Sequence, residues 1–370
     1  MTHRNREIDR LRAFAVSFVL LHHGSLLLPG PNAWQGIVNV WFNGTTGVDL
    51  FFVISGYVIA QSFMRRFDGA LQGGTEPALG AALEFFGRRF RRLFPASLFW
   101  AFVILLGNVA LFPMNPWLPL DQAFAKFVAN ALYLSNFNEL NQATAFGYYW
   151  SLALEMQFYL LLPVFLACCR SDRMRLIVLL AIVALSPLLA GFEGWWMFRV
   201  SGLVLGVALH IGVTALGGRL DPFAQLGRGN GVLTAALLVA LLLVTVAIPQ
   251  VPALAVMVAS LLAFVLVYAA SFERGYVPSF GADRVLDWIG TRSYSIYLAH
   301  IPIMIFNQVA WVLWLGPQGI AVGPAQALPA LVTCLIAVGL AAELSYRAIE
   351  LPFQRQPRQL DAAAQPGPAA

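Results

Sequence analysis

Residues 10–28 read RLRAFAVSFVLLHHGSLLL, an apolar stretch interrupted by a few polar side chains, among them Arg12 and His23. These two residues are eleven positions apart. Eleven steps of an α-helix return to within about 20° of the start, so both side chains lie on one face, roughly 16 Å apart along the axis. Ionisable groups within an apolar span are costly in lipid and usually face a bundle interior or a watery cavity. The alternative is an anchoring arginine and a hydrogen-bonded core histidine.

The composition indicates a polytopic membrane protein. Of 370 residues, 59% are hydrophobic and 11% are charged, whereas a soluble domain carries about 25% charged residues. The net charge of +5 comes from arginines in short loops, so it does not indicate a nucleic-acid partner. Cys168, Cys169 and Cys334 have no metal-ligand spacing, which predicts free thiols and no metal site.

The basic amino terminus followed by an apolar stretch resembles a signal peptide at first sight. The stretch is longer than a typical signal-peptide core, contains His22 and His23, and lacks a small-residue cleavage site. We therefore expect an uncleaved first span.

Apolar stretches long enough to cross a bilayer predict ten helices. When the loops alternate between the two sides, every basic residue except Lys126 and Arg199 falls on one side, and the positive-inside rule makes that side cytoplasmic. The sequence thus predicts an all-α, polytopic transmembrane helical bundle of about ten helices with both termini cytoplasmic. We expect one domain over residues 1–355 and a disordered tail over residues 356–370. The ten stretches are 11–28, 47–64, 93–112, 149–168, 176–192, 195–213, 231–249, 252–271, 294–315 and 325–345.

Two connecting segments stand out by length. The segment between the second and third spans, Arg65–Arg92, is rich in Gly and Ala in its middle, and we expect a mobile cytoplasmic loop. On the other side, Asp121–Leu134 has the pattern of an amphipathic or half-inserted helix.

Three ionisable residues are expected near the outer mouth of the bundle. His23 lies toward the outer end of the first span, Asp49 opens the second, and Glu155 lies one turn inside the fourth. Ser151, Glu155 and Tyr159 recur every four residues and share one helical face. A carboxylate that accepts from one imidazole nitrogen raises the basicity of the other. For Asp49, an interfacial helix cap is the alternative. Burial of an unpaired Glu155 carboxylate costs too much free energy for a residue without a function.

The inner half contains a basic cluster and a second histidine. Four guanidinium groups fall within five residues, and guanidinium groups suit the binding of phosphates. The alternative is that these arginines lie beside lipid headgroups and only set the membrane topology. In the ninth span Ser293, Tyr297, His300 and Asn307 share one face. We expect the inner mouth of the bundle to bind a polyanion and the outer mouth to remove a proton from an acceptor. His300 and His23 are expected to lie at different depths between the two mouths. The four arginines are Arg88, Arg89, Arg91 and Arg92.

At these positions the chain resembles acyltransferase family three of integral membrane proteins, over about residues 6–355. The matching motifs occur in family order at membrane-compatible positions. They are IDRLRA from Ile8 leading to His23, GVDLFFVISGY from Gly47, RRLFP from Arg91, WSLALEMQFY from Trp150, SYSIYLAH from Ser293 and ELPF from Glu350.

The resemblance implies a membrane O-acyltransferase in the bacterial inner membrane, corresponding to the membrane domain only. Its donor is cytoplasmic acyl-CoA, expected to be acetyl-CoA, used as a substrate with no permanently bound cofactor. Its acceptor is a hydroxyl of an extracytoplasmic sugar or lipid-linked glycan. The alternative is a polytopic transporter or flippase, although the sequence shows no paired halves of the kind many transporters have. The acyl group, the acceptor and the oligomeric state stay open.

The resemblance implies that Arg12 and His23 are the characteristic pair of the family and links the arginine cluster before the third span to the donor. The mechanism built on them is a hypothesis from the layout of the residues. His23 removes the acceptor proton or carries the acyl group, while Asp49 or Glu155 orients it. The remaining polar groups bind substrate or serve structure. The residues expected to bind CoA are Arg12, Arg88, Arg89, Arg91 and Arg92, and the remaining polar groups are Ser55, Ser151, Tyr159, Tyr297 and His300.

Overall fold

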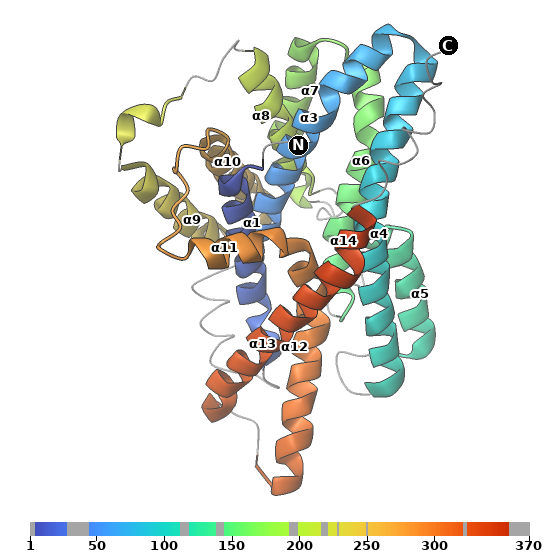
Figure 1. Ribbon diagram of the computed structural model, residues 1–370, viewed down its shortest axis with the longest axis vertical. Helices are drawn as coiled ribbons and strands as arrows, with labels where there is room; N and C mark the ends of the chain where they lie inside the picture. Colours follow the sequence, from blue (N-terminus) through green and yellow to red (C-terminus); the bar gives the residue numbers. More distant parts are fainter. Residues whose placement is uncertain are drawn as a thin grey trace, which may run out of the picture.

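The computed structural model is a helical bundle (Figure 1). Among the residues that it describes, all regular secondary structure is helical. The predicted tail over residues 356–370 lies outside them. The described ranges are 4–27, 44–111, 118–137, 144–191, 199–215, 221–227, 229–248, 251–320 and 324–354.

Each of the ten predicted spans overlaps an α-helix among the described residues. Seven described helices are long and apolar enough to cross a membrane, which confirms the predicted membrane bundle. The other three, α1, α7 and α8, have 17, 14 and 15 residues. The ten helices are α1 (Arg6–His22), α3 (Thr46–Gln72), α4 (Thr75–Leu111), α6 (Trp150–Cys168), α7 (Asp172–Leu185), α8 (Ser201–Ala215), α9 (Gly229–Ala247), α10 (Pro252–Ala270), α12 (Ser293–Leu315) and α13 (Ala327–Ser345).

Shorter helices connect the spans. The amphipathic helix expected near residue 121 is present as α5 (Leu120–Ala131). At the end where α1 begins, here called the basic end, α11 (Asp283–Thr291) lies across the direction of the long helices (Figure 1). The other short elements are η1 (His23–Leu27), η2 (Ser135–Phe137), η4 (Gly147–Tyr149), η5 (Ser186–Gly191), η7 (Ala224–Leu226), η8 (Gly316–Gln318), η9 (Pro324–Gln326), the π-helix η10 (Tyr346–Glu350) and α14 (Leu351–Gln354).

The prediction of a long, mobile loop over Arg65–Arg92 is wrong. Helix α3 continues to Gln72 and α4 begins at Thr75, so the turn between them contains only Gly73 and Gly74. The physical reason is composition, because two of the five glycines form the turn, and most of the other residues are Ala, Leu, Arg, Glu or Gln, which have high helix propensity. The basic cluster therefore lies on a regular helix, where spacing decides which side chains face the bundle.

Helices α3 and α8 pack at backbone contact. A Cβ atom added at Gly56 would lie 2.1 Å from the Leu203 carbonyl oxygen, and one at Gly206 would lie 2.2 Å from the Val53 carbonyl oxygen. Small residues permit this approach between membrane helices. Gly56 therefore lets the backbone of α8 approach, and this contact fixes α3 against α8.

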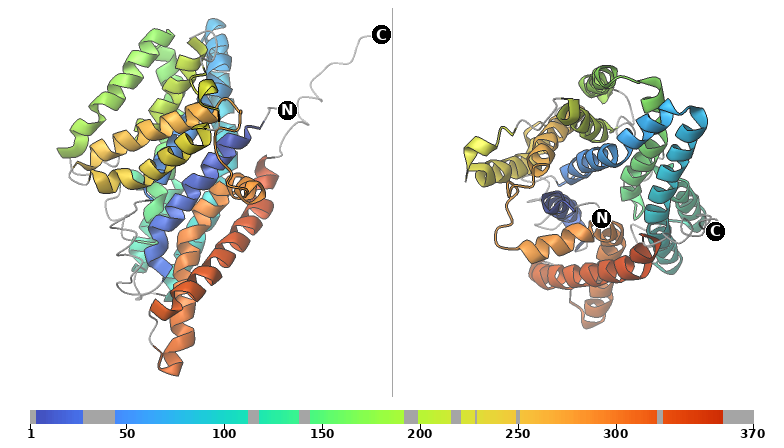
Figure 2. Two further views of the ribbon diagram at one scale, coloured as in Figure 1. Left: turned by 90° about the vertical axis from the view of Figure 1, so that its left-hand side faces the viewer. Right: turned by 45° about the horizontal axis from the view of Figure 1, so that its top comes forward.

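Helix α1 packs against α3, α10, α11 and α12, and the end-on view places it inside the ring of other helices (Figure 2). Its contact with α11 is very close, since a Cβ atom at Gly290 would lie 2.1 Å from the Asp9 carbonyl oxygen. Because α11 occupies the space beside the first turns of α1, α12 begins farther along the α1 axis.

A matched glycine pair in α8 tests the close helix contact. We expect Gly206→Val to lower the thermal unfolding temperature in detergent, because overpacking against rigid backbone costs about 1–3 kcal/mol or more. Gly212→Val is the control, since a Cβ atom there meets nothing within 4 Å. Size-exclusion chromatography of the heated, fluorescently tagged protein measures both. Equal unfolding temperatures for the two variants would contradict the packing.

Candidate functional site

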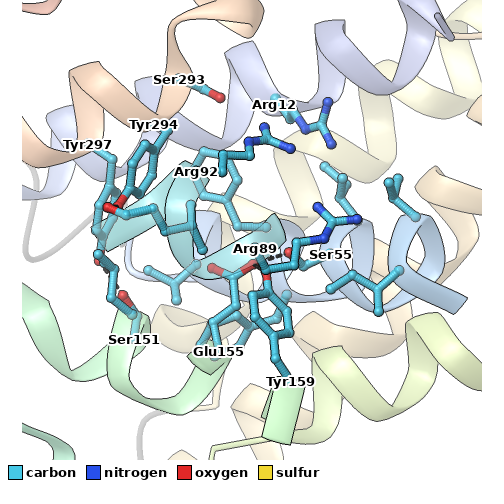
Figure 3. Close-up of a pocket in the computed structure, with 18 residues that line it drawn as sticks. Arg12, Ser55, Arg89, Arg92, Ser151, Glu155, Tyr159, Ser293, Tyr294 and Tyr297 are labelled. Atoms are coloured by element: carbon cyan, nitrogen blue, oxygen red, sulfur yellow. Dashed lines mark hydrogen bonds between the residues drawn. The ribbon is translucent and has the colours of Figure 1, made fainter. Parts of the chain in front are cut away.

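A cavity with about 800 Å³ of empty space, here called the chamber, lies between α1, α3, α4, α6 and α12 (Figure 3). Apolar side chains of α3, α4 and α6 form part of its wall. Ten of the eighteen lining residues carry its polarity. They are Arg12, Ser55, Arg89, Arg92, Ser151, Glu155, Tyr159, Ser293, Tyr294 and Tyr297.

A second, wider cavity, here called the vestibule, opens at the basic end with about 2010 Å³ of empty space. It is lined mostly by polar residues and shares Arg12, Arg89 and Arg92 with the chamber. These three guanidinium groups, here called the arginine ring, come from α1 and α4. The two cavities meet at this ring.

Helical spacing divides the predicted arginine clamp into two pairs. Arg89 and Arg92 are three residues apart on α4 and both line the chamber and the vestibule. Arg88 and Arg91 are exposed on the other side of the helix, and Arg88 donates to Glu84. The structure therefore brings half of the predicted cluster to the site.

Arg12 is fixed by its own helix. Its Nη1 donates to Oδ1 of Asp9 at 2.8 Å, and the other oxygen of Asp9 accepts from Arg4. The Arg12 side chain remains 25% exposed, so its guanidinium still reaches both cavities. Arg12 therefore faces a cavity, as its position within an apolar span predicts.

Glu155 points into the chamber and accepts hydrogen bonds from the hydroxyls of Ser55 and Tyr159 (Figure 3). The predicted stripe of Ser151, Glu155 and Tyr159 on α6 is thus confirmed as a cavity wall. With three arginines and one carboxylate, the chamber wall carries a net positive charge.

The chamber ends at a pair of hydroxyls opposite the arginine ring (Figure 3). The hydroxyl oxygens of Ser151 and Tyr297 lie 2.6 Å apart. Tyr297 also donates to the Tyr148 carbonyl oxygen at 3.0 Å, and Tyr148 donates to the Leu298 carbonyl oxygen at 2.6 Å. These bonds fix α12 against the start of α6.

The two histidines meet on the far side of Tyr297. Nε2 of His300 lies 3.3 Å from Nδ1 of His23, so the expectation of two different depths is wrong. His23 follows Arg6 by 17 residues, whereas His300 follows Ser293 by 7. The displaced start of α12 beside α11 compensates for this difference of about 15 Å.

The contact expected between Asp49 and the imidazole is replaced by an ion pair. Nε and Nη2 of Arg199 donate to the two oxygens of Asp49, and the side chains are 9% and 1% exposed. The guanidinium also lies 5.5 Å from the centre of the Trp150 ring. A buried carboxylate needs a charged partner, and Arg199 supplies it. Among the described residues, His23 contacts the Val19 carbonyl oxygen and His300 in place of Asp49 or Glu155.

Several site residues were missed by sequence reasoning. Tyr148 and Tyr294 carry no charge and do not fall on the predicted stripes. Arg199 had a signal, since it was one of two basic residues on the wrong side of the topology. Glu350 lies in the last family motif, is buried in the π-helix and accepts from Ser295 at the edge of the vestibule.

The arrangement suits transfer of a group from an anionic carrier. Guanidinium groups at the vestibule can bind phosphates in bidentate fashion. The chamber beyond them is narrower and offers hydroxyls and one carboxylate for hydrogen bonding. An imidazole can serve as a general base, but neither His23 nor His300 is among the residues that line the chamber or the vestibule.

Comparison with known proteins indicates acyl transfer. Similar proteins are the peptidoglycan O-acetyltransferase OatA of Listeria monocytogenes (28% identical), the putative peptidoglycan O-acetyltransferase YrhL of Bacillus subtilis (26%) and the O-acetyltransferase OatA of Staphylococcus aureus (28%). Each alignment covers 94% of this chain, which spans 55–57% of the length of these relatives. No solved structure matches the chain. The model of a family described as an acyltransferase domain matches residues 5–344, and the chain belongs to this acyltransferase family.

Proposed function

We propose that the protein is an O-acetyltransferase of the bacterial inner membrane. It takes an acetyl group from acetyl-CoA at the cytoplasmic basic end and transfers it to a hydroxyl of a cell-wall glycan at the opposite end. The observation that carries the proposal is the junction of vestibule and chamber at the arginine ring. The names of the relatives from Listeria monocytogenes and Bacillus subtilis support peptidoglycan as the acceptor class.

The donor fits the two cavities in sequence. The nucleotide and phosphates of CoA occupy the vestibule, where Arg89, Arg92 and Arg12 neutralise negative charge. The thin, uncharged pantetheine arm passes the ring into the chamber. Its thioester then reaches the end formed by Ser151 and Tyr297.

The reaction is a direct displacement at the thioester carbonyl. The acceptor oxygen attacks the carbonyl carbon, a C–O bond forms and the C–S bond breaks. His23 takes the hydroxyl proton as general base. The proton ends on the thiolate of CoA, so the products are an O-acetyl ester and CoA thiol, and the step needs no co-reactant.

Reconstituted proteoliposomes test this function. With labelled acetyl-CoA on the side of the basic end and an oligomeric peptidoglycan fragment on the other, we expect labelled ester on the glycan and an equal amount of CoA thiol. Passage of labelled glycan or sugar across the membrane without consumption of acetyl-CoA would establish the transporter alternative and contradict the proposal.

Substitution of the proposed base gives a second prediction. We expect His23→Ala to lower acetyl transfer by about 10²- to 10⁴-fold, the usual contribution of general base catalysis. Elution volume and unfolding temperature serve as folding controls. Transfer within a few-fold of the unsubstituted protein would remove His23 from the mechanism.

The division of the arginine cluster gives a third prediction with a built-in control. Arg89→Gln and Arg92→Gln are each expected to raise the KM for acetyl-CoA about tenfold or more, since a charge-assisted hydrogen bond contributes about 1.5–3 kcal/mol. Arg88→Gln and Arg91→Gln remove the same charge from the exposed side of α4. Steady-state kinetics in one detergent compare all four, and equal effects would rule out specific donor binding at the ring.

A further inference from the structure

His300 is fully buried, with 0% of its surface exposed. One of its nitrogens contacts the backbone and the other contacts His23. Nδ1 lies 2.5 Å from the Tyr297 carbonyl oxygen, and Nε2 lies 3.3 Å from Nδ1 of His23. Tyr148 and Tyr297 pack against the ring, with centroids 5.2 and 5.5 Å away. The ring therefore has a fixed place and a fixed orientation.

The partners assign the tautomer of His300. A carbonyl oxygen only accepts hydrogen bonds, so Nδ1 carries the proton and donates it to Tyr297. In a neutral imidazole the other nitrogen, Nε2, then holds a lone pair. This lone pair faces His23, so His300 presents an acceptor to that ring.

The same argument assigns His23. Its Nδ1 lies 3.0 Å from the Val19 carbonyl oxygen, one helical turn earlier, so this nitrogen also carries a proton. The proton is shared between the carbonyl oxygen and Nε2 of His300. Nε2 of His23 is left with the lone pair and is the basic nitrogen of the pair.

We propose that His300 is a positioning residue for acetyl transfer and that its neutral imidazole holds His23 in the tautomer and orientation of a general base. This inference rests on the proposed function and adds a residue to it. The role is the one that a carboxylate fills in a Ser-His-Asp triad. Here Asp49 is bound to Arg199, and an uncharged acceptor occupies the place beside the base.

The contact strengthens as the reaction proceeds. When Nε2 of His23 takes the proton of the acceptor hydroxyl, the ring becomes an imidazolium, and its Nδ1–H bond to His300 becomes charge-assisted. His300 keeps its own proton throughout. Because the interaction is stronger in the transition state than before it, its loss reduces kcat more than it weakens substrate binding.

Tyr297 links this pair to the chamber. Its carbonyl oxygen holds His300, while its hydroxyl lies 2.6 Å from the Ser151 hydroxyl at the chamber end. One residue of α12 thus fixes the base relative to the place of the thioester. His300 acts through His23 and does not touch the donor, so the KM for acetyl-CoA is a separate readout.

The test compares two substitutions that remove the ring. Gln places a side-chain amide oxygen near the position of Nε2 and can accept from His23, whereas Leu keeps bulk without an acceptor. We expect His300→Leu to lower kcat roughly 10- to 100-fold, as for residues that orient metal-bound imidazoles. His300→Gln is expected to retain several-fold more activity than Leu, and both are expected to leave the KM for acetyl-CoA within two- to threefold.

Asn307→Leu is the matched control. Asn307 is another polar residue of α12, and its amide donates to the Ala330 carbonyl oxygen of α13 at 3.2 Å. We expect kcat to stay near that of the unsubstituted protein. A Gln variant no more active than the Leu variant, or a Leu variant with unchanged kcat, would overturn the role of His300. Absence of acetyl transfer by the unsubstituted protein would instead overturn the proposed function itself.

Discussion

The contact between α11 and the first turns of α1 determines the geometry of the site. Gly290 allows the two backbones to touch at Asp9, and α12 begins beyond this contact. His300, near the start of α12, thereby reaches the depth of His23, near the end of α1. The same register leaves Arg12 at the boundary between vestibule and chamber. The short helix α11 thus determines both where Arg12 of the arginine ring lies and which residue contacts the His23 imidazole.

The charged residues of the site lie at different positions between the vestibule and the far end of the chamber. Asp9 binds Arg12 from the basic end, whereas Glu155 accepts from the hydroxyls of Ser55 and Tyr159. The arginine ring is therefore not fully paired by carboxylates, and it keeps donors for an anion. Beyond the chamber the only described ion pair near the start of α3 joins Asp49 to Arg199. Because Asp49 is bound to Arg199, the imidazoles of His23 and His300 contact each other.

Periodicity and hydropathy predicted much of this molecule, because both properties are local. A helix overlaps each of the ten predicted spans, and seven of these helices are long and apolar enough to cross a membrane. The stripe of Ser151, Glu155 and Tyr159 lines the chamber, and Arg12 faces a cavity, as predicted. The failures concern relations between helices. The depth of His300 against His23 depends on the register set by α11, and the partner of Asp49 comes from a residue 150 positions away. The loop predicted over Arg65–Arg92 was a failure of a different kind, since strong helix formers make up most of this segment and only Gly73 and Gly74 form a turn.

A structure with a bound donor analogue tests the central claim most directly. The suitable compound is a ketone analogue of acetyl-CoA in which a methylene group replaces the thioester sulfur, and cryo-electron microscopy in nanodiscs gives the readout. The account predicts phosphates at Arg89 and Arg92, the pantetheine arm through the ring, and the ketone beside Ser151 and Tyr297. An analogue held on the protein surface, with its acyl end outside the chamber, would contradict it.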